Sequence, residues 1–212
     1  MTQNKYKKYI KKFIIVFFWL GVWQLLAMFV DNFLLVVTPL QALRALLTLA
    51  GQAEFWQSAF GSLWRIALGF LLGAVPALFL AAVSYRHRIV EEVLQPFMVF
   101  CKAVPVAVFA VLLLIWWGSS MLVAAICFLV VFPNIYLNTL EGLKSPDREL
   151  LEMAEVFRLP FRTRFFYIYR PALKPFLLSA FQLSLGMCWK SGVAAEVIGT
   201  PAHSIGGALY LA

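Results

Sequence analysis

Five long apolar stretches constrain the fold of this chain more than any other feature. They run at about 13–30, 58–83, 93–117, 121–137 and 175–198. Each reaches or approaches the roughly 20 residues that an α-helix needs to cross about 30 Å of hydrocarbon. The apolar residues are continuous and do not alternate with a period of two, which favours helices over a β-barrel. We therefore predict an all-α, polytopic transmembrane helical bundle with about five spans.

The composition excludes a soluble fold and argues against a nucleic-acid partner. Hydrophobic residues make up 63% of the chain and charged residues 13%, whereas a soluble domain is nearer half apolar and a quarter charged. The net charge of +8 is carried mostly by short segments between apolar stretches. That distribution is typical of membrane topology and not of a phosphate-binding face. The lipid bilayer is the expected solvent.

Lysine and arginine predict the orientation of the chain. With the N-terminus in the cytoplasm, fourteen of these residues fall on the cytoplasmic side and only Arg44 on the other. The positive-inside rule therefore places the N-terminus and the basic loop 140–174 in the cytoplasm. No small-residue cleavage site follows the first apolar stretch, so we expect a retained span and not a signal peptide.

The segment 33–50 is apolar but interrupted by Thr38 and Pro39. Proline is favoured at the first position of a helix, so we predict a short interfacial helix that begins near Pro39. A sixth span in this segment is the alternative.

The loop 140–174 is predicted to hold two short helices with a bend. Ser145 is the expected N-cap, with Pro146 at the first helical position. An apolar stripe follows, consisting of Leu150, Ala154 and Phe157. Pro160 breaks the first helix, and a second segment, 161–169, is expected to end before Pro171. An amphipathic pair of this length favours a docking surface for a cytoplasmic partner over a solvated connector.

Four charged residues lie within the apolar stretches: Arg65, Lys102, Lys190 and Glu196. Each costs about a few kcal/mol near the bilayer centre unless it is paired or hydrated. Lys190 and Glu196 point about 120° apart on one helix and cannot simply neutralise each other. Arg65 and Glu196 fall at similar depth, so an ion pair between them is one hypothesis; snorkelling of Arg65 to the interface is the other. The apolar stretches thus hold three cations and one anion. If a solute passes between these helices, this balance slightly favours an anion.

No catalytic, metal or cofactor motif is found. The chain lacks a glycine-rich phosphate-binding loop, and its two histidines, His87 and His203, are far apart in sequence. We predict that the chain is not an enzyme and binds no metal or cofactor.

The loop 140–174 contains a spaced motif. Glu152, Met153 and Ala154 begin it, and Ile168 and Pro171 end it. At this motif the chain resembles the membrane subunits of bacterial ABC importers, which share Glu-Ala-Ala, three residues, Gly, nine residues, then Ile-x-Leu-Pro at the same spacing. The resemblance implies that ATP would be hydrolysed by a separate subunit.

Two departures from this motif concern the shape of the loop. Arg158 occupies the glycine position and Arg170 the leucine position. Glycine would ease the turn between the two short helices, whereas arginine tolerates a positive φ poorly. The departures therefore bear on the local loop conformation more than on the family resemblance.

Further motifs resemble the nitrate, sulfonate and taurine branch of these permeases. They include Ser-Leu-Trp-Arg at 62–65, Trp-Trp-Gly at 116–118 and Ala-Glu at 195–196, and the resemblance covers about 38–212. Members of the branch continue with another span after the segment that resembles 199–212. We therefore expect a single permease domain over 1–212 that lacks a final span, either as a truncated form or as a natural short form.

The resemblance implies a type I importer permease in a bacterial cytoplasmic membrane. Its implied partners are cytoplasmic ATP-binding subunits, an extracytoplasmic substrate-binding protein and a second permease chain, with a homodimer expected. The residues implied to couple the chain to the ATPase are Glu152, Met153, Ala154, Phe157, Arg158, Ile168 and Pro171. The alternative function is an ion-coupled secondary carrier or small channel that uses Lys102, Lys190 and Glu196 as a relay.

Overall fold

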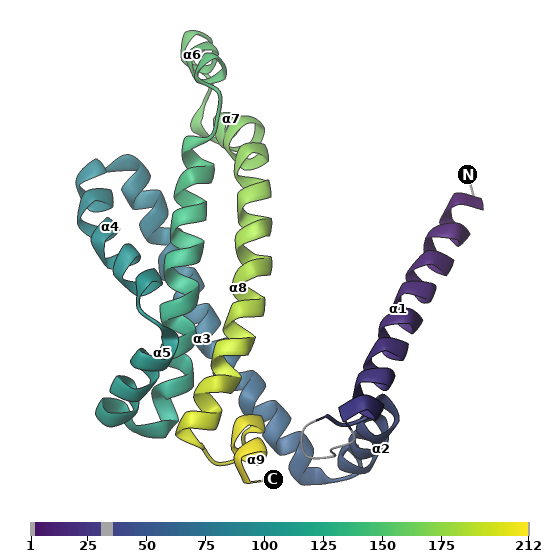
Figure 1. The fold of residues 1–212 in the computed structure, drawn as a ribbon. Coiled ribbons are helices and arrows are strands. Elements are labelled where there is room, and N and C mark those ends of the chain that lie inside the picture. Colours follow the sequence, from purple (N-terminus) through teal and green to yellow (C-terminus); the bar gives the residue numbers. More distant parts are fainter. Residues whose placement is uncertain (1–2, 31–35, 212) are drawn as a thin grey trace. The chain divides into compact units, whose positions relative to one another are not determined.

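The computed structural model describes the backbone of residues 3–30 and 36–211 and the side chains within 10–29 and 36–210. The lysines at positions 5, 7 and 8, which contribute to the predicted orientation, lie outside the residues whose side chains are described. The chain divides into two compact units, Met1–Trp56 and Gln57–Ala212, and each is described by itself. All regular structure in the described residues is helical (Figure 1). The predicted all-α class is therefore confirmed.

The described helices differ widely in length. They are α1 (Gln3–Val30), α2 (Pro39–Ala50), α3 (Ala53–Arg86), α4 (Arg88–Ala103), α5 (Val106–Lys144), α6 (Arg148–Val156), α7 (Phe161–Arg164), the π-helical turn η1 (Phe165–Tyr169), α8 (Arg170–Gly199) and α9 (Ile205–Leu211). Within the described part of the chain, three helical segments are long and apolar enough to cross a membrane: Ile10–Phe29 of α1, α3 and α5. These segments fit the predicted polytopic membrane bundle, with the number of spans approximate.

The first unit contains α1 and α2. Thr38 caps α2: its side chain accepts a hydrogen bond from the backbone of Gln41, and the Gln41 side chain accepts one from the Thr38 backbone. With Pro39 in the first turn, this reciprocal capping fixes the start of the helix. The predicted short helix at Pro39 is confirmed. The Trp23 indole donates to the Val37 carbonyl at 3.1 Å.

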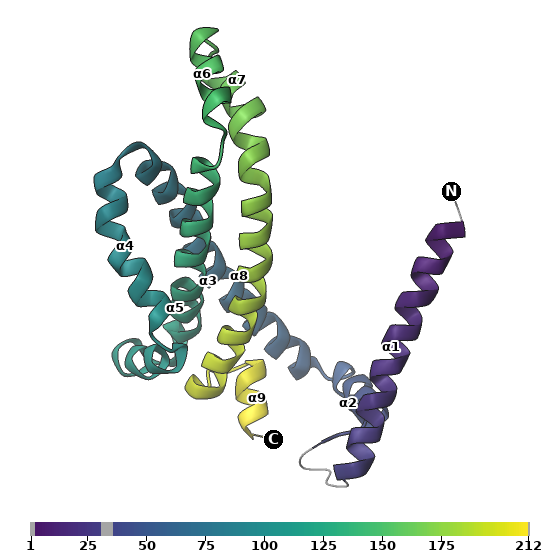
Figure 2. The ribbon, with the colours of Figure 1, turned by 45° about the horizontal axis from the view of Figure 1, so that its top comes forward.

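The core of the second unit lies along α5 and α8, which run side by side in both views (Figure 1 and Figure 2). The α5 side chains Leu122, Ile126 and Tyr136 are completely or almost completely buried. Gly69 allows α3 to approach α5 closely, because a side chain there would collide with Ala124 and Cys127. Small residues at helix contacts permit close van der Waals packing inside a membrane.

The predicted span 93–117 is not one continuous helix. α4 ends at Ala103 and α5 begins at Val106, with Val104 extended at φ −82° and ψ 129°. Pro105 explains the break, because it lacks a backbone N–H and biases the preceding residue away from the helical region. A second interruption lies at Gly118, whose φ of 70° and ψ of −174° separate the 106–117 part of α5 from the rest.

The loop 140–174 begins differently from the prediction. The N-cap of α6 is Asp147, whose carboxylate accepts a hydrogen bond from the Glu149 backbone at 3.1 Å. Ser145 instead follows the last residue of α5, and its hydroxyl donates to the Gly142 carbonyl at 2.8 Å. The expected N-cap at Ser145 is wrong because α5 extends to Lys144 and uses that hydroxyl at its own end.

The second short helix does not end before Pro171. The chain passes from α7 through the π-helical turn η1 directly into α8. The Arg170 backbone N–H bonds to the Phe165 carbonyl, five residues earlier. Pro171 falls in the first turn of α8. Because proline has no backbone N–H to donate, the wider π-helical turn η1 lets the helix continue through this position.

Candidate functional site

Only one residue of the predicted apolar stripe Leu150, Ala154 and Phe157 packs the loop helix α6 against the rest of the second unit. Ala154 is completely buried, whereas Leu150 is 46% exposed and Phe157 71% exposed. Arg164 fastens the bend that follows α6, since it donates to the carbonyls of Ala154 at 3.1 Å and Leu159 at 3.0 Å. The stripe therefore does not hold the helix as a whole: its two large members form outward apolar surface.

Arg158 adopts the conformation that the family's glycine would favour. Its φ is 48°, in the left-handed region that costs a non-glycine residue roughly 1–2 kcal/mol. The Arg158 N–H bonds to the Glu155 carbonyl, and the Leu159 N–H bonds to the Ala154 carbonyl, both at 2.9 Å. These two bonds form a Schellman motif that ends α6. The turn is therefore kept despite the substitution.

The other predicted coupling residues divide between surface and interior. Glu152 is exposed and forms an ion pair with Arg148 at 2.9 Å, one turn earlier on α6. Met153 is 44% exposed, whereas Ile168 of η1 is buried. Pro171 lies exposed at the start of α8. The structure thus places Glu152, Met153 and Phe157 on one exposed helical loop and uses Ile168 for packing.

A buried polar cluster lies at the opposite end of α8. The Glu196 side chain is completely buried, and its Oε2 accepts hydrogen bonds from the Ser62 hydroxyl at 2.7 Å and the Gly206 backbone at 3.1 Å. Arg65 Nη1 lies 3.8 Å from Glu196 Oε1. We call Ser62, Arg65, Glu196 and Gly206 the Glu196 node. The structure therefore brings Arg65 and Glu196 together, as the pairing hypothesis proposed.

The Glu196 node attaches the segment after α8 to α3. Arg65 also donates to the carbonyls of Ala202 at 2.8 Å and His203 at 3.2 Å. The Ile205 backbone donates to the Ser62 hydroxyl at 2.9 Å. The Ser62 hydroxyl thus donates to Glu196 and accepts from Ile205. Arg65 neutralises the charge of Glu196 and also donates hydrogen bonds to two backbone carbonyls. The segment 200–207 is fixed by side chains from α3 and α8.

Sequence reasoning missed two members of the Glu196 node. Ser62 precedes Arg65 by three residues, so both lie on one face of α3; this spacing is the signal that identifies it. Gly206 approaches Glu196 so closely that a side chain there would collide with Glu196 Cβ. That requirement depends on the tertiary fold and leaves no local signal beyond the glycine itself.

The two lysines predicted as pathway charges stand apart from this cluster. Lys102 lies in the last turn of α4 and Lys190 on α8, and both are exposed in this chain. Among the described side chains, neither lysine forms a hydrogen bond or ion pair with Glu196. The four predicted charges therefore separate into one buried pair and two exposed cations.

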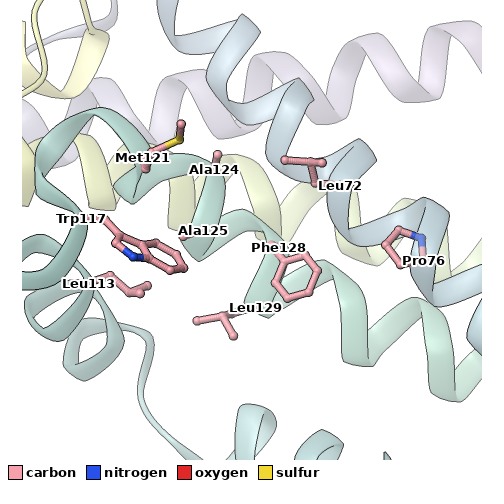
Figure 3. Close-up of a pocket in the computed structure, with 9 residues that line it drawn as sticks. All are labelled: Leu72, Pro76, Leu113, Trp117, Met121, Ala124, Ala125, Phe128 and Leu129. Atoms are coloured by element: carbon pink, nitrogen blue, oxygen red, sulfur yellow. The ribbon is translucent and has the colours of Figure 1, made fainter.

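An apolar cavity of about 770 Å³ lies between α3 and α5. Figure 3 shows its lining: Leu72, Pro76, Leu113, Trp117, Met121, Ala124, Ala125, Phe128 and Leu129. These side chains are almost entirely apolar, and recognition of a charged solute requires placed polar groups. The cavity is therefore not a candidate anion site. Trp117 faces it, while Trp116 is 71% exposed.

Comparison with known proteins identifies the family. Residues 69–209 match the model of the binding-protein-dependent transport system inner membrane component family. The chain is 28% identical to a Bacillus subtilis protein named as an aliphatic sulfonates transport permease, SsuC, over 85% of this chain and 66% of the relative. The Escherichia coli protein of the same name is 29% identical over 76% of this chain and 62% of the relative.

A third relative carries a different name. The bicarbonate transport system permease protein CmpB of Synechocystis is 26% identical over 68% of this chain and 51% of the relative. The chain thus spans less than two thirds of the length of these relatives, at most 66%. The family match includes most of α3, all of α4 to α8 and the Glu196 residue itself. This integral membrane protein belongs to the family of binding-protein-dependent transport system inner membrane components.

Proposed function

We propose that the chain is the permease subunit of an ATP-driven importer that moves a small anionic solute across the bacterial cytoplasmic membrane. The observation that carries the proposal is the family match over 69–209, which includes both the α6 loop and Glu196. The N-terminus and the loop 140–174 lie in the cytoplasm, in accordance with the lysine and arginine distribution. Two copies of the chain form the pathway.

Cytoplasmic ATP-binding subunits dock on α6. The exposed Leu150, Met153 and Phe157 provide an apolar face, and the Glu152 carboxylate lies beside it. A partner that covers this face would bury the large side chains that the chain itself leaves exposed. The Schellman motif and Arg164 fasten the bend after α6. Motion of the ATP-binding subunits would therefore pass through this bend into α8.

The solute is a small anion, and an extracytoplasmic binding protein delivers it. The names of two relatives specify aliphatic sulfonates and bicarbonate, and both are anions at neutral pH. Lys102 and Lys190 are exposed and uncompensated by Glu196 in the described structure. They are available to lower the cost of moving negative charge through the membrane.

The carrier alternative receives less support from the geometry. A proton or ion relay would join Lys102, Lys190 and Glu196 through hydrogen bonds or water. Glu196 instead bonds to Ser62 and Gly206 and pairs with Arg65. Its contacts favour a fixed structural role near the end of α8.

Uptake by proteoliposomes tests the proposal. The chain is reconstituted with candidate ATP-binding and substrate-binding proteins from the same organism, and entry of labelled sulfonate and bicarbonate is measured. We expect entry of at least one anion that requires both ATP and the binding protein. Entry driven by a proton gradient in the absence of ATP would contradict the importer and support the carrier.

A further inference from the structure

We propose that a basic pocket on α7 and η1 binds the phosphate headgroup of an anionic membrane lipid. The pocket has a volume of about 350 Å³ and is lined by Arg162, Thr163, Phe166, Tyr167 and Arg170. Two guanidinium groups and two hydroxyls therefore surround one space. The proposal rests on the cytoplasmic placement of this loop given under the proposed function.

The two arginines of the pocket differ from Arg88, Arg148 and Arg164, whose guanidinium groups are already bonded. Arg148 pairs with Glu152 and Arg88 with Glu92, whereas Arg164 donates to two backbone carbonyls. In the described structure, no such bond engages the guanidinium of Arg162 or Arg170. Both remain able to donate to an external anion.

Aromatic contact orients one of these guanidinium groups. Arg170 lies over the Phe166 ring, with 5.7 Å between the guanidinium carbon and the ring centroid. The cation–π contact restrains the side chain without using its N–H donors. A planar guanidinium with free donors fits phosphate oxygens in a two-bond geometry.

The π-helical turn contributes to the shape of the pocket. Arg162 and Arg170 are eight residues apart and would point about 80° from each other on a regular α-helix. η1 lies between them and closes with the bond from Arg170 N–H to the Phe165 carbonyl. A π-helical turn holds an extra residue, which lowers the rotation per residue and turns Arg170 back toward Arg162. Such turns occur frequently at functional sites.

The surroundings favour a lipid over a protein partner. α8 begins at Arg170, and no charged residue occurs between Lys174 and Lys190. The pocket therefore lies directly beside the uncharged, mostly apolar stretch 175–189 of α8. Phe166 is 55% exposed and Tyr167 79% exposed, and exposed aromatic side chains are typical of the membrane interface. Basic pockets at the cytoplasmic surface bind anionic headgroups.

The pocket is a feature of this chain more than of its family motif. Arg170 occupies the position at which the motif has leucine. A leucine there would remove one of the two guanidinium groups and the contact with Phe166.

Native mass spectrometry of the purified full chain tests the pocket. Binding of dioleoylphosphatidylglycerol is compared with binding of dioleoylphosphatidylcholine, and we expect preference for the anionic lipid. Each arginine near an anionic lipid contributes a factor of about five, so we expect R162A/R170A to weaken phosphatidylglycerol binding about 30-fold. R162K/R170K keeps both charges and should lose less.

Arg86 supplies the matched control, because it is an exposed arginine at the end of α3 outside the pocket. Arg86→Ala should change phosphatidylglycerol binding less than twofold. Arg86→Ala removes one charge, so it is compared with the single variants R162A and R170A, each of which should weaken phosphatidylglycerol binding about five-fold. An equal loss in Arg86→Ala would overturn the proposal, since it would indicate only a general effect of charge. Thermal unfolding of each variant verifies that the fold is retained; if R162A/R170A unfolds, the lysine pair and Arg86→Ala still decide.

Two further outcomes would also overturn the proposal. Millimolar inorganic phosphate that displaces phosphatidylglycerol would identify a site for a free anion. If R162A/R170A loses binding to the ATP-binding subunit but binds phosphatidylglycerol as the wild-type chain does, the pocket is a contact for a protein and not for a lipid. The lipid measurement requires neither ATP nor solute. ATP-driven uptake with no preference for the anionic lipid would contradict the lipid-binding pocket alone. Preference for the anionic lipid without ATP-driven uptake would contradict the proposed importer function alone.

Discussion

The two ends of the 57–212 unit use their polar residues in opposite ways. At the Glu196 node, a fully buried carboxylate is bonded by Ser62 and Gly206 and paired with Arg65. At the α6–η1 end, the Arg148–Glu152 pair is exposed and two arginines line an open pocket. The difference indicates that the first end fixes the fold, whereas the second leaves its charges and apolar side chains available to partners.

The largest expected effect distinguishes a buried carboxylate from an exposed one. Glu196→Ala removes the acceptor for Ser62 and Gly206 and leaves Arg65 without its counter-charge. We expect the free energy of unfolding to fall by about 3 kcal/mol, near the lower limit for breaking a buried pair, because Arg65 remains partly exposed. Unfolding in mixed detergent and SDS micelles measures the loss.

Glu152→Ala is the matched control for this comparison. Its pair with Arg148 is solvent-exposed and of the i,i+4 type, so its loss should cost only about 0.3–0.5 kcal/mol. Equal losses of stability in the two variants would remove the distinction between a structural end and a partner-binding end.

A double-mutant cycle sharpens the account of the Glu196 node. Arg65→Ala, Glu196→Ala and the double variant should give a coupling energy of about 1 kcal/mol. The expected coupling is modest because the 3.8 Å separation is long for a hydrogen bond and Arg65 also serves two carbonyls. Additive effects would show that Arg65 acts only on the segment that contains Ala202 and His203.

A smaller effect is expected at the turn after α6. Arg158→Gly should relieve left-handed strain and raise stability by less than about 1 kcal/mol, since the flexibility of glycine in the unfolded chain offsets part of the gain. Glu155→Gly, at a neighbouring helical position, should cost about 1 kcal/mol. A loss in Arg158→Gly as large as in Glu155→Gly would mean that Arg158 stabilises the turn through its side chain.

Local chemistry explains what the sequence predicted. The start signal of α2 lies within four residues, from Thr38 through Pro39 to Gln41. Helix depth suggested the pairing of Arg65 with Glu196 as one of two hypotheses, the other being snorkelling of Arg65 to the interface. The break at Pro105 was missed because apolar composition continues across it. The N-cap at Asp147 was missed because Ser145 has the same capping chemistry, and only the length of α5 decides between them.

Features that depend on tertiary contact were harder to predict. The π-helical turn that carries the chain into α8 has no established local signal, and Pro171 suggested a helix end instead. The outward position of Leu150 and Phe157 also contradicts a simple reading of an amphipathic stripe. That stripe predicts which residues share a face, but it does not specify whether the same chain or a partner covers them.

Affinity purification of the chain with its ATPase tests the central claim, that α6 is a docking surface, most directly. The wild-type chain should retain an ATP-binding subunit from the same organism. Phe157→Ser should weaken retention at least tenfold, because an exposed aromatic side chain is a typical anchor of an interface. Leu209→Ser, which alters an exposed apolar residue of α9 at the other end, should leave it unchanged. Full retention by Phe157→Ser, or no retention by the wild-type chain, would contradict the account.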